Sequence, residues 1–346
     1  MWKNIFLKSV KVLGKKNKKA GNGEKMEKKV ISDYGQLEGS LQFGVEMDPG
    51  KKPMGGPPVD FKPPMADISW VKRKYLDVAY AEESPNQRLD IYLPEEGEGP
   101  FPVLFHIHGG GFAIGDKRDD HMDTYLKFLK KGIAVGSIEY RLSGEAIFPA
   151  AVLDCREAIR FAREHAGRYQ LDPSHIGVIG GSAGGNISAI LGMNIPNGAF
   201  PGEEGRTFTG DCHVNVAVDQ FGPVSFQVMD EQAKENRISY ADHNEPTSAE
   251  SSYMGGALPG LDKEYVAKAS PITYINPSMA PLLVQHGRMD RLVPYQQSEM
   301  LVNAIREKQT DAVVAFTTLP TADHEDKQYG SEENMELLWQ FIRKYL

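Results

Sequence analysis

Cysteine is scarce in this chain, and long hydrophobic runs are absent. Only Cys155 and Cys212 occur among 346 residues, which excludes a disulfide framework. No apolar stretch approaches the ~18 residues that a membrane-spanning helix needs. The first apolar segment, residues 5–14, is interrupted twice by lysine, so it does not fit a secretory signal with its run of ~7–15 apolar residues. These absences favour a cytoplasmic protein.

An excess of positive charge is also lacking. The net charge is −8, and because phosphate binding needs clustered positive charge, we expect no nucleic-acid partner. The exception is residues 1–30, with ten lysines and two glutamates. Within residues 1–15 the apolar side chains share one helical face and the lysines lie off it, which is compatible with contact to an anionic membrane surface. A short helix docked on the body of the protein and a disordered basic tail are the alternatives.

The chain divides into an irregular segment and a regular domain. Residues 1–67 are basic and rich in glycine and proline, and they are a candidate for part of a cap over a binding site. In residues 68–346, apolar runs typical of buried strands alternate with segments of helical period. This order predicts an α/β fold with a mostly parallel central sheet and helices on both faces. Residues 222–280 interrupt the alternation and are predicted to form a cap-like insertion.

Ser182 lies in the motif GGSAG, residues 180–184, which fits G-x-S-x-G. The motif follows the strand-like run IGVI and precedes a helix-like segment. This context is typical of a nucleophile elbow, where a sharp strand-to-helix turn exposes a serine hydroxyl. The phosphate-binding patterns G-x-G-x-x-G and the P-loop with its lysine are absent here, which disfavours a nucleotide site.

A second glycine-rich motif, HGGGF, spans residues 108–112 at the end of another predicted strand. Consecutive glycines let backbone N–H groups approach a substrate without an intervening Cβ. Such N–H groups can stabilise the negative oxygen of a tetrahedral intermediate. We therefore assign the oxyanion hole to the N–H groups of Gly110, Gly111 and Ala183, and we expect His108 to brace the loop.

The remaining catalytic residues follow from chain order, which is serine, then an acid, then histidine. Asp290 and His324 each follow a predicted strand, where the sites of α/β proteins are built. We predict that Ser182 is the nucleophile, His324 the general base, and Asp290 the acid that orients it. Asp219, which follows a third predicted strand, is the alternative acid.

Other histidines fit the base position less well. His106 and His286 fall within strand-like runs and are expected to be packed. The others have no matching position at a strand end, namely His121, His165, His175, His213 and His243. The neighbours Asp323 and Glu325 are not expected to orient the ring of His324. No metal site is apparent.

The motifs, taken together and in order, resemble the α/β-hydrolase esterases. The resemblance rests on HGGGF, YRLSGEAIFPAAVLDC, GGSAGGN, DQFGP, HGRMDRLVP and DHED, and it covers about residues 72–346. The groups most similar are the hormone-sensitive-lipase-like esterases and the bacterial carbohydrate esterases that include feruloyl and acetyl esterases. The resemblance implies an α/β-hydrolase fold and a serine esterase that needs no metal or cofactor. It also implies the same triad of Ser182, Asp290 and His324.

The expected substrate is a small-molecule ester with a short-chain or carbohydrate-linked acyl group, cleaved through an acyl-serine intermediate. Two alternatives stay open. The same triad serves an amidase, a peptidase or a formamidase-type enzyme. A non-catalytic binding protein with a hydrolase fold is disfavoured, because the full set of catalytic residue types is present. The sequence does not indicate an oligomeric state.

Overall fold

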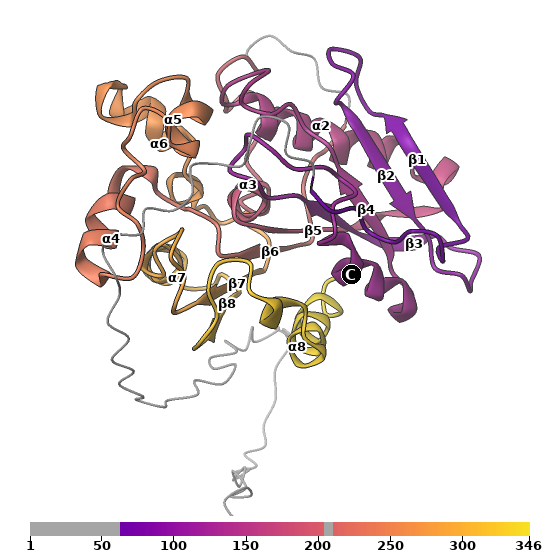
Figure 1. Ribbon diagram of the computed structural model, residues 1–346. Helices are drawn as coiled ribbons and strands as arrows, with labels where there is room; N and C mark the ends of the chain where they lie inside the picture. The colour runs from indigo at the N-terminus through magenta and orange to yellow at the C-terminus, as the bar shows by residue number, and fades with distance from the viewer. Residues whose placement is uncertain (1–62, 204–209) are drawn as a thin grey trace, which may run out of the picture. The chain divides into compact units, whose positions relative to one another are not determined.

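The computed structural model describes residues 63–203 and 210–346 (Figure 1). The expectations for residues 1–62, including membrane contact through residues 1–15 and a contribution to a cap, lie outside this part. The strands are β1 (Lys74–Ala79), β2 (Arg88–Tyr92), β3 (Phe101–Ile107), β4 (Ala134–Ile138), β5 (Leu171–Gly181), β6 (Val216–Gln220), β7 (Leu282–Gly287) and β8 (Val314–Leu319). The α-helices are α1 (Met122–Tyr125), α2 (Ala150–Glu164), α3 (Ala183–Gly192), α4 (Met229–Asn236), α5 (Ala249–Met254), α6 (Lys263–Lys268), α7 (Gln296–Lys308) and α8 (Glu332–Ile342). The 3-10 helices are η1 (Leu126–Lys131), η2 (Ala166–Tyr169), η3 (Phe226–Val228), η4 (Leu258–Gly260), η5 (Pro271–Tyr274) and η6 (Lys327–Gly330).

All of these strands join one sheet, in the order β1-β2-β4-β3-β5-β6-β7-β8. β1 pairs with β2, and β2 with β4, in antiparallel fashion, whereas every other neighbouring pair is parallel. The mostly parallel sheet predicted from the sequence is confirmed. Because β3, β5, β6, β7 and β8 run in the same direction, the loops after their carboxyl ends meet at one edge of the sheet.

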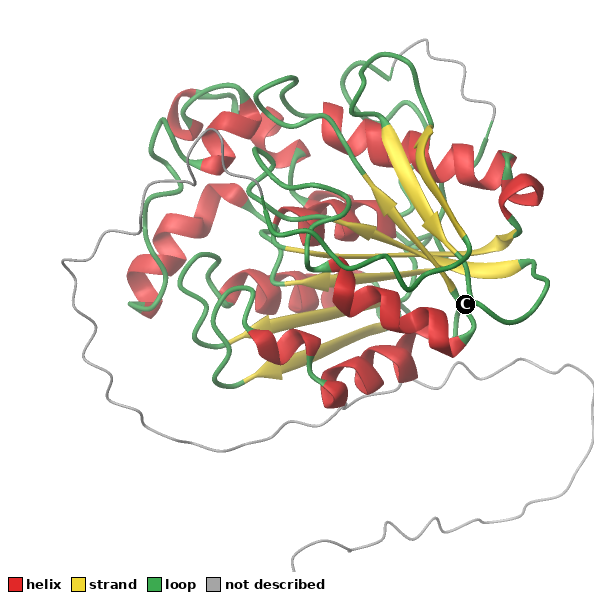
Figure 2. Ribbon diagram, turned by 45° about the vertical axis from the view of Figure 1, so that its right-hand side comes forward, coloured by secondary structure: helices red, strands yellow, loops and turns green. Residues whose placement is uncertain are grey.

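Helices cover both faces of the sheet (Figure 2). Apolar residues of α2, α3 and α7 pack with one face, and those of α1 and α8 pack with the other. On β3, Phe105 belongs to the first core and Leu104 to the second, and both side chains are fully buried. Burying each such side chain contributes roughly 1.5–3 kcal/mol. Burial on both faces explains the nearly continuous apolar runs of the central strands.

The segment between β6 and β7 is an insertion into the regular alternation. It contains α4, α5 and α6 and the 3-10 helices η3, η4 and η5. Two of its helices are capped at the N-terminus: the Ser248 side chain accepts from the N–H of Ser251, and Asp262 accepts from that of Tyr265. The segment coincides with the predicted cap, residues 222–280, whose role in covering a site stays a prediction.

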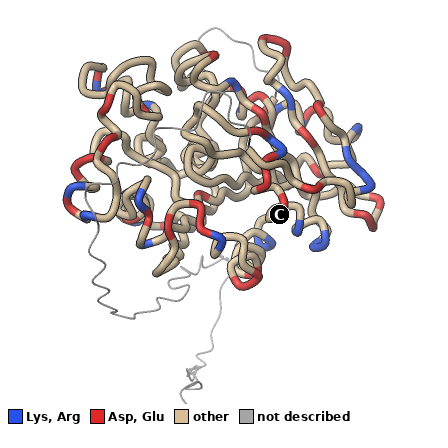
Figure 3. The backbone as a smooth tube through the Cα atoms, in the orientation of Figure 1, with Lys and Arg blue, Asp and Glu red and all other residues tan. Residues whose placement is uncertain are grey.

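Charges of both signs are interspersed along the described residues, as Figure 3 shows. No helix among residues 63–203 and 210–346 has the length and apolar character to cross a membrane. Cys155 and Cys212 are both free and buried. Burial raises the pKa of the Cys155 thiol, which keeps it in the less reactive protonated form.

A buried ionic cluster joins α2 to the loop that follows β4. Asp154 is 2% exposed. Its carboxylate accepts from the Arg141 side chain, with Nη2 at 2.7 Å and Nε at 2.9 Å from its two oxygens, and from the Arg141 backbone N–H at 2.9 Å. The Gln87 side chain donates to it at 2.8 Å. A buried carboxylate is tolerated only when it is paired and hydrogen-bonded in this way.

Asp154→Ala is expected to lower the free energy of unfolding by about 3–5 kcal/mol, because it removes the buried carboxylate that pairs with the partly buried Arg141 guanidinium. Urea denaturation of the wild type and the variant measures this difference. Arg141→Ala in the Asp154→Ala background is expected to cost much less than Arg141→Ala alone. Equal costs in the two backgrounds would show that the pair is not coupled.

Candidate active site

Ser182 occupies the sharp turn between β5 and α3. Its backbone lies in the left-handed region for φ, with φ 55° and ψ −121°, which is unusual for a residue with a side chain. The turn is held by two backbone hydrogen bonds: Ser182 N–H donates to Gln220 O at 2.9 Å, and Asn186 N–H donates to Ser182 O at 3.0 Å. The geometry is that of the nucleophile elbow predicted from GGSAG.

Gly184 allows the first turn of α3 to lie directly against the end of β3. A Cβ atom at this position would lie 2.0 Å from the carbonyl oxygen of Ile107 and 2.7 Å from that of His108. Both atoms are backbone, so neither can move aside without shifting the sheet. The glycine that follows the serine by two positions is therefore required by close packing between β3 and α3.

The HGGGF loop lies beside Ser182. A Cβ placed on Gly109 would be 3.5 Å from the Cβ of Ser182, and Gly110 has φ 97°, which favours glycine. The N–H groups of Gly110, Gly111 and Ala183 have no hydrogen-bond acceptor among the described residues. Their assignment as oxyanion donors stays a prediction that this placement favours.

His108 and Phe112 hold the two ends of this loop. The Nδ1 atom of His108 lies 2.9 Å from Gly109 O, its Nε2 lies 3.3 Å from Glu139 Oε1, and its ring stacks on Tyr140 at 4.2 Å. The ring of Phe112 stacks on that of Tyr253, with the two centroids 3.8 Å apart. Because Tyr253 belongs to α5, the loop beside the serine is anchored to the insertion.

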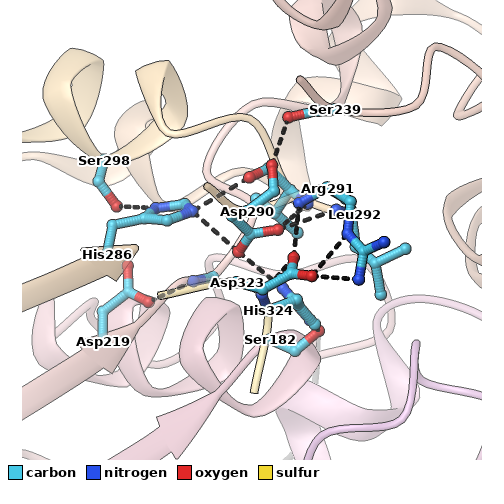
Figure 4. Close-up of polar contacts among 12 residues, drawn as sticks. Ser182, Asp219, Ser239, His286, Asp290, Arg291, Leu292, Ser298, Asp323 and His324 are labelled. Atoms are coloured by element: carbon cyan, nitrogen blue, oxygen red, sulfur yellow. Dashed lines mark hydrogen bonds and ion pairs between the residues drawn. The ribbon is translucent and has the colours of Figure 1, made fainter. Parts of the chain in front are cut away.

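The structure brings the three predicted triad residues together in one chain of hydrogen bonds (Figure 4). The Oγ atom of Ser182 lies 2.9 Å from Nε2 of His324. The Nδ1 atom of the same ring lies 2.8 Å from Oδ2 of Asp290. The other carboxylate oxygen, Oδ1, accepts from the N–H groups of Leu292 and Val293 at 2.9 and 2.8 Å.

Burial and charge act in opposite directions on these groups. Burial alone would raise the pKa of Asp290, but the neighbouring His324 and the donated hydrogen bonds hold it well below its usual range. Burial alone would lower the pKa of His324, but the Asp290 carboxylate raises it above its ordinary value. Asp290 therefore stays ionised and stabilises a proton on His324, which is what the predicted role of His324 as a general base requires.

Asp323 ties the loop of Asp290 to the loop of His324. Its Oδ1 atom accepts from the backbone N–H of Arg291 at 3.0 Å and from that of His324 at 2.8 Å. Its Oδ2 atom accepts from Nε of Arg291 at 2.6 Å. The expectation that Asp323 would not orient the ring of His324 holds for the ring itself. This carboxylate nevertheless positions both backbones, a role that the sequence did not predict.

His286 is the second residue that the sequence analysis undervalued. It is fully buried on β7, as expected, but its Nε2 atom lies 3.2 Å from Asp290 Oδ2 (Figure 4). The spacing of four residues in HGRMD was the available signal, since a tight turn after the strand folds Asp290 back toward His286.

Phe221 covers the base from the side of β6. Its ring meets that of His324 edge to face, with centroids 4.8 Å apart. The same ring packs against Gly181, where a Cβ would lie 2.7 Å from the ring. An apolar side chain thus shields one side of the imidazole.

Asp219, the alternative acid, is hydrogen-bonded to the backbone of Gly222 and not to the ring of His324. Its Oδ1 atom accepts from the N–H of Gly222 at 2.8 Å, and its Oδ2 atom has no hydrogen-bond partner among the described residues. Burial raises its pKa to about 7. The carboxylate that reaches Nδ1 of His324 is that of Asp290.

The remaining histidines pair with groups away from the triad. The partner atoms belong to Asp119 for His121, Phe161 for His165, Asp172 for His175, Asp211 for His213 and Glu250 for His243. His106 is buried and stacks on Tyr125. The ligand atoms of Asp119, Asp120 and His121 come within 4.8 Å of one another, but clusters of acidic groups are common without a metal, and nothing else there points to an ion.

A surface hollow of about 420 Å³ lies outside this site. It is lined by Trp70, Leu93, Glu95, Leu129, Lys130 and Gly132, among others. Gly132 precedes β4, so the hollow lies at the amino end of the parallel strands, opposite the edge that carries Ser182.

Comparison with known proteins matches residues 89–305 to the BD-FAE family. The probable carboxylic ester hydrolase LipM of Mycobacterium tuberculosis is 28% identical over 81% of this chain and 63% of its own length. Esterase LipQ of the same organism is 30% identical over 72% of this chain and 56% of its own. The chain thus spans about three fifths of the length of these curated relatives. Among solved structures, a truncated carbohydrate esterase from gut microbiota matches with a TM-score of 0.70 and 28% identity, over 81% of this chain and 99% of that one.

Gly184→Ala is expected to destabilise the protein by about 1–3 kcal/mol, because the added methyl group overpacks the contact between α3 and β3. Thermal and urea unfolding measure the loss. Gly167→Ala is the matched control, since a Cβ there meets no atom within 4 Å. The close-packing explanation fails if the two variants are equally stable.

Proposed function

Because the chain belongs to the BD-FAE family of α/β-hydrolase esterases, we propose that it hydrolyses carboxylic esters through an acyl intermediate on Ser182. The observation that carries the proposal is the hydrogen-bond chain from Ser182 Oγ through His324 to Asp290, with distances of 2.9 and 2.8 Å. The strained backbone of Ser182 and the pKa directions of Asp290 and His324 support the same conclusion.

The proposed reaction assigns one task to each residue. Ser182 Oγ attacks the ester carbonyl carbon while its proton moves to Nε2 of His324. The bond to the alcohol breaks, and His324 returns the proton to the departing oxygen. A water molecule then attacks the acyl-serine with His324 again accepting the proton, which releases the acid and restores Ser182. Asp290 holds the ring and stabilises the imidazolium that forms in each half.

The negative charge of each tetrahedral intermediate falls on the former carbonyl oxygen. We assign its stabilisation to the N–H groups of Gly110 and Gly111 in the HGGGF loop and of Ala183 at the start of α3. The positive end of the α3 dipole reinforces the Ala183 donor. No metal or cofactor has a role in this proposal.

The proposed substrates carry a short or carbohydrate-linked acyl group. The support is the match to a solved carbohydrate esterase at 28% identity, together with the curated esterases of Mycobacterium tuberculosis. The acyl group would occupy space bounded by the oxyanion loop and the insertion, since Gly111 lies against Ala249 of α5.

A fluorophosphonate probe is expected to label the wild-type protein on the peptide that contains Ser182, and to leave Ser182→Ala unlabelled. The reason is that the probe reacts with a serine only when a base activates its hydroxyl. Mass spectrometry of the digested protein locates the label. Ser188→Ala, which removes another serine of α3, is the matched control and should be labelled like the wild type.

The same preparations should be tested with p-nitrophenyl esters of rising acyl length, acetylated sugars, feruloyl esters and anilides. Turnover of short or sugar-linked esters that disappears in Ser182→Ala supports the proposal. Turnover of anilides alone would instead favour an amidase. A wild-type protein that takes up no label and cleaves none of these compounds would refute catalysis at Ser182.

Asp290→Asn is expected to reduce kcat by roughly 10³–10⁴-fold, because an amide can hold the ring of His324 in the wrong tautomer and cannot stabilise its charge. Asp219→Asn is expected to cost less than about tenfold, since it perturbs a hydrogen bond worth about 1 kcal/mol that does not reach the base. Steady-state kinetics on one ester measure both. Similar losses in the two variants would contradict the choice of Asp290 as the acid.

A further inference from the structure

His286 lies on the far side of Asp290 from the catalytic base. Its ring is fully buried, and both of its nitrogen atoms have partners. Nδ1 lies 2.7 Å from the hydroxyl oxygen of Ser298 on α7. Nε2 lies 3.2 Å from Asp290 Oδ2 and 3.1 Å from the carbonyl oxygen of Val293.

These partners determine where the ring carries its hydrogen. A carbonyl oxygen and an ionised carboxylate can only accept, so Nε2 carries the hydrogen and shares it between Val293 O and Asp290 Oδ2. In the neutral ring Nδ1 then accepts from the Ser298 hydroxyl. Donation to Nδ1 polarises the ring and strengthens Nε2–H as a donor.

With His286 included, four donors surround the Asp290 carboxylate. Oδ1 accepts from the N–H groups of Leu292 and Val293, and Oδ2 accepts from His286 and His324. A carboxylate offers about four lone-pair sites, so all of them are used. The group is 1% exposed, and rotation about its terminal bond would break several hydrogen bonds at once.

We propose that His286 is a positioning residue, which fixes the Asp290 carboxylate and draws part of its negative charge away from His324 through a shared oxygen, Oδ2. This inference rests on the proposed function, because it assumes that His324 is the general base. The Ser298 hydroxyl is part of the same proposal, because its hydrogen bond to Nδ1 holds the His286 ring in place.

The sign of the effect follows from the sharing. Without the His286 donor, Oδ2 carries more negative charge toward His324 and stabilises its protonated form. A protonated His286 ring would act in the same direction, so the sign does not depend on its charge. The other charged groups that face His324 are Glu325 and Asp323. The hydrogen-bond partners of the His286 ring are Ser298, Asp290 and Val293. The ring of Tyr295 meets that of His286 edge to face, with centroids 5.6 Å apart.

His286→Phe keeps a flat ring and removes the donor. We expect the acidic limb of the profile of kcat/KM against pH to move upward by roughly half a unit to one unit. This shift is smaller than the full worth of a charge-assisted hydrogen bond, because the lost bond stabilises Asp290 in both protonation states of His324. His286→Gln places an amide N–H near the position of Nε2–H and is expected to restore the wild-type limb. Ser298→Ala should shift the limb upward by a smaller amount.

A second measurement uses no substrate. The Nδ1–H proton of His324 is hydrogen-bonded to Asp290, and its NMR signal can be followed while the pH is varied. The pH at the midpoint of the His324 titration is expected to rise in His286→Phe. His106→Phe is the matched control, because His106 is also a buried strand histidine but makes no hydrogen bond to the triad among the described residues. The pKa of His106 is lowered to about 3 by burial, so the control removes no charge in the range measured.

Three outcomes would overturn the inference: an unchanged or lowered midpoint in His286→Phe, an equal rise in His106→Phe, or no restoration by His286→Gln. If His286→Phe does not fold, an unchanged midpoint in Ser298→Ala overturns it. Failure of the proposed function is a different result, since it would appear as a wild-type protein without esterase turnover or labelling of Ser182. The NMR titration would still report whether His286 affects His324.

Discussion

The buried carboxylate of Asp290 is the constraint on which the rest of the site depends. An ionised carboxylate that is almost fully removed from water is tolerated only if its oxygens are supplied with donors. The turn after β7 supplies two from the backbone, β7 supplies His286, and the loop after β8 supplies His324. The path of three segments is thus set by the need to solvate one charge inside the protein.

The sheet makes this arrangement possible because its parallel strands end at one edge. The residues that meet at Ser182 come from the loops after β3, β5, β6, β7 and β8, which are far apart in sequence. The helices and the two apolar cores hold these strands in register. The loops can then be short and closely packed, as the hydrogen bonds of Asp323 to Arg291 and His324 illustrate.

Much of this arrangement was predictable from sequence, for identifiable reasons. Strand and helix periods revealed the alternation of the domain, and the chain order of Ser182, Asp290 and His324 selected the residues that meet. His286 and Asp323 were not recognised, because their roles depend on how turns fold back and not on a periodic pattern. A histidine inside an apolar strand looks like packing, and an aspartate next to a histidine in sequence cannot reach its ring. The contact of Phe221 with Gly181 and His324 depends on three loops at once, so no local pattern contains it.

The absence of a side chain at Gly184 has a mechanical consequence for the whole site. Through this contact, β3 and α3 form one rigid unit that holds both Ser182 and the adjoining glycine loop. His324 and Asp290 belong to a second unit, formed by the ends of β7 and β8 and joined by Asp323. The two units meet at the Ser182–His324 hydrogen bond and at the ring of Phe221. Loosening of the second unit would separate His324 from Ser182 while Ser182 and the glycine loop stayed in place, so the proposed acyl transfer would stop without any change in the shape of that loop.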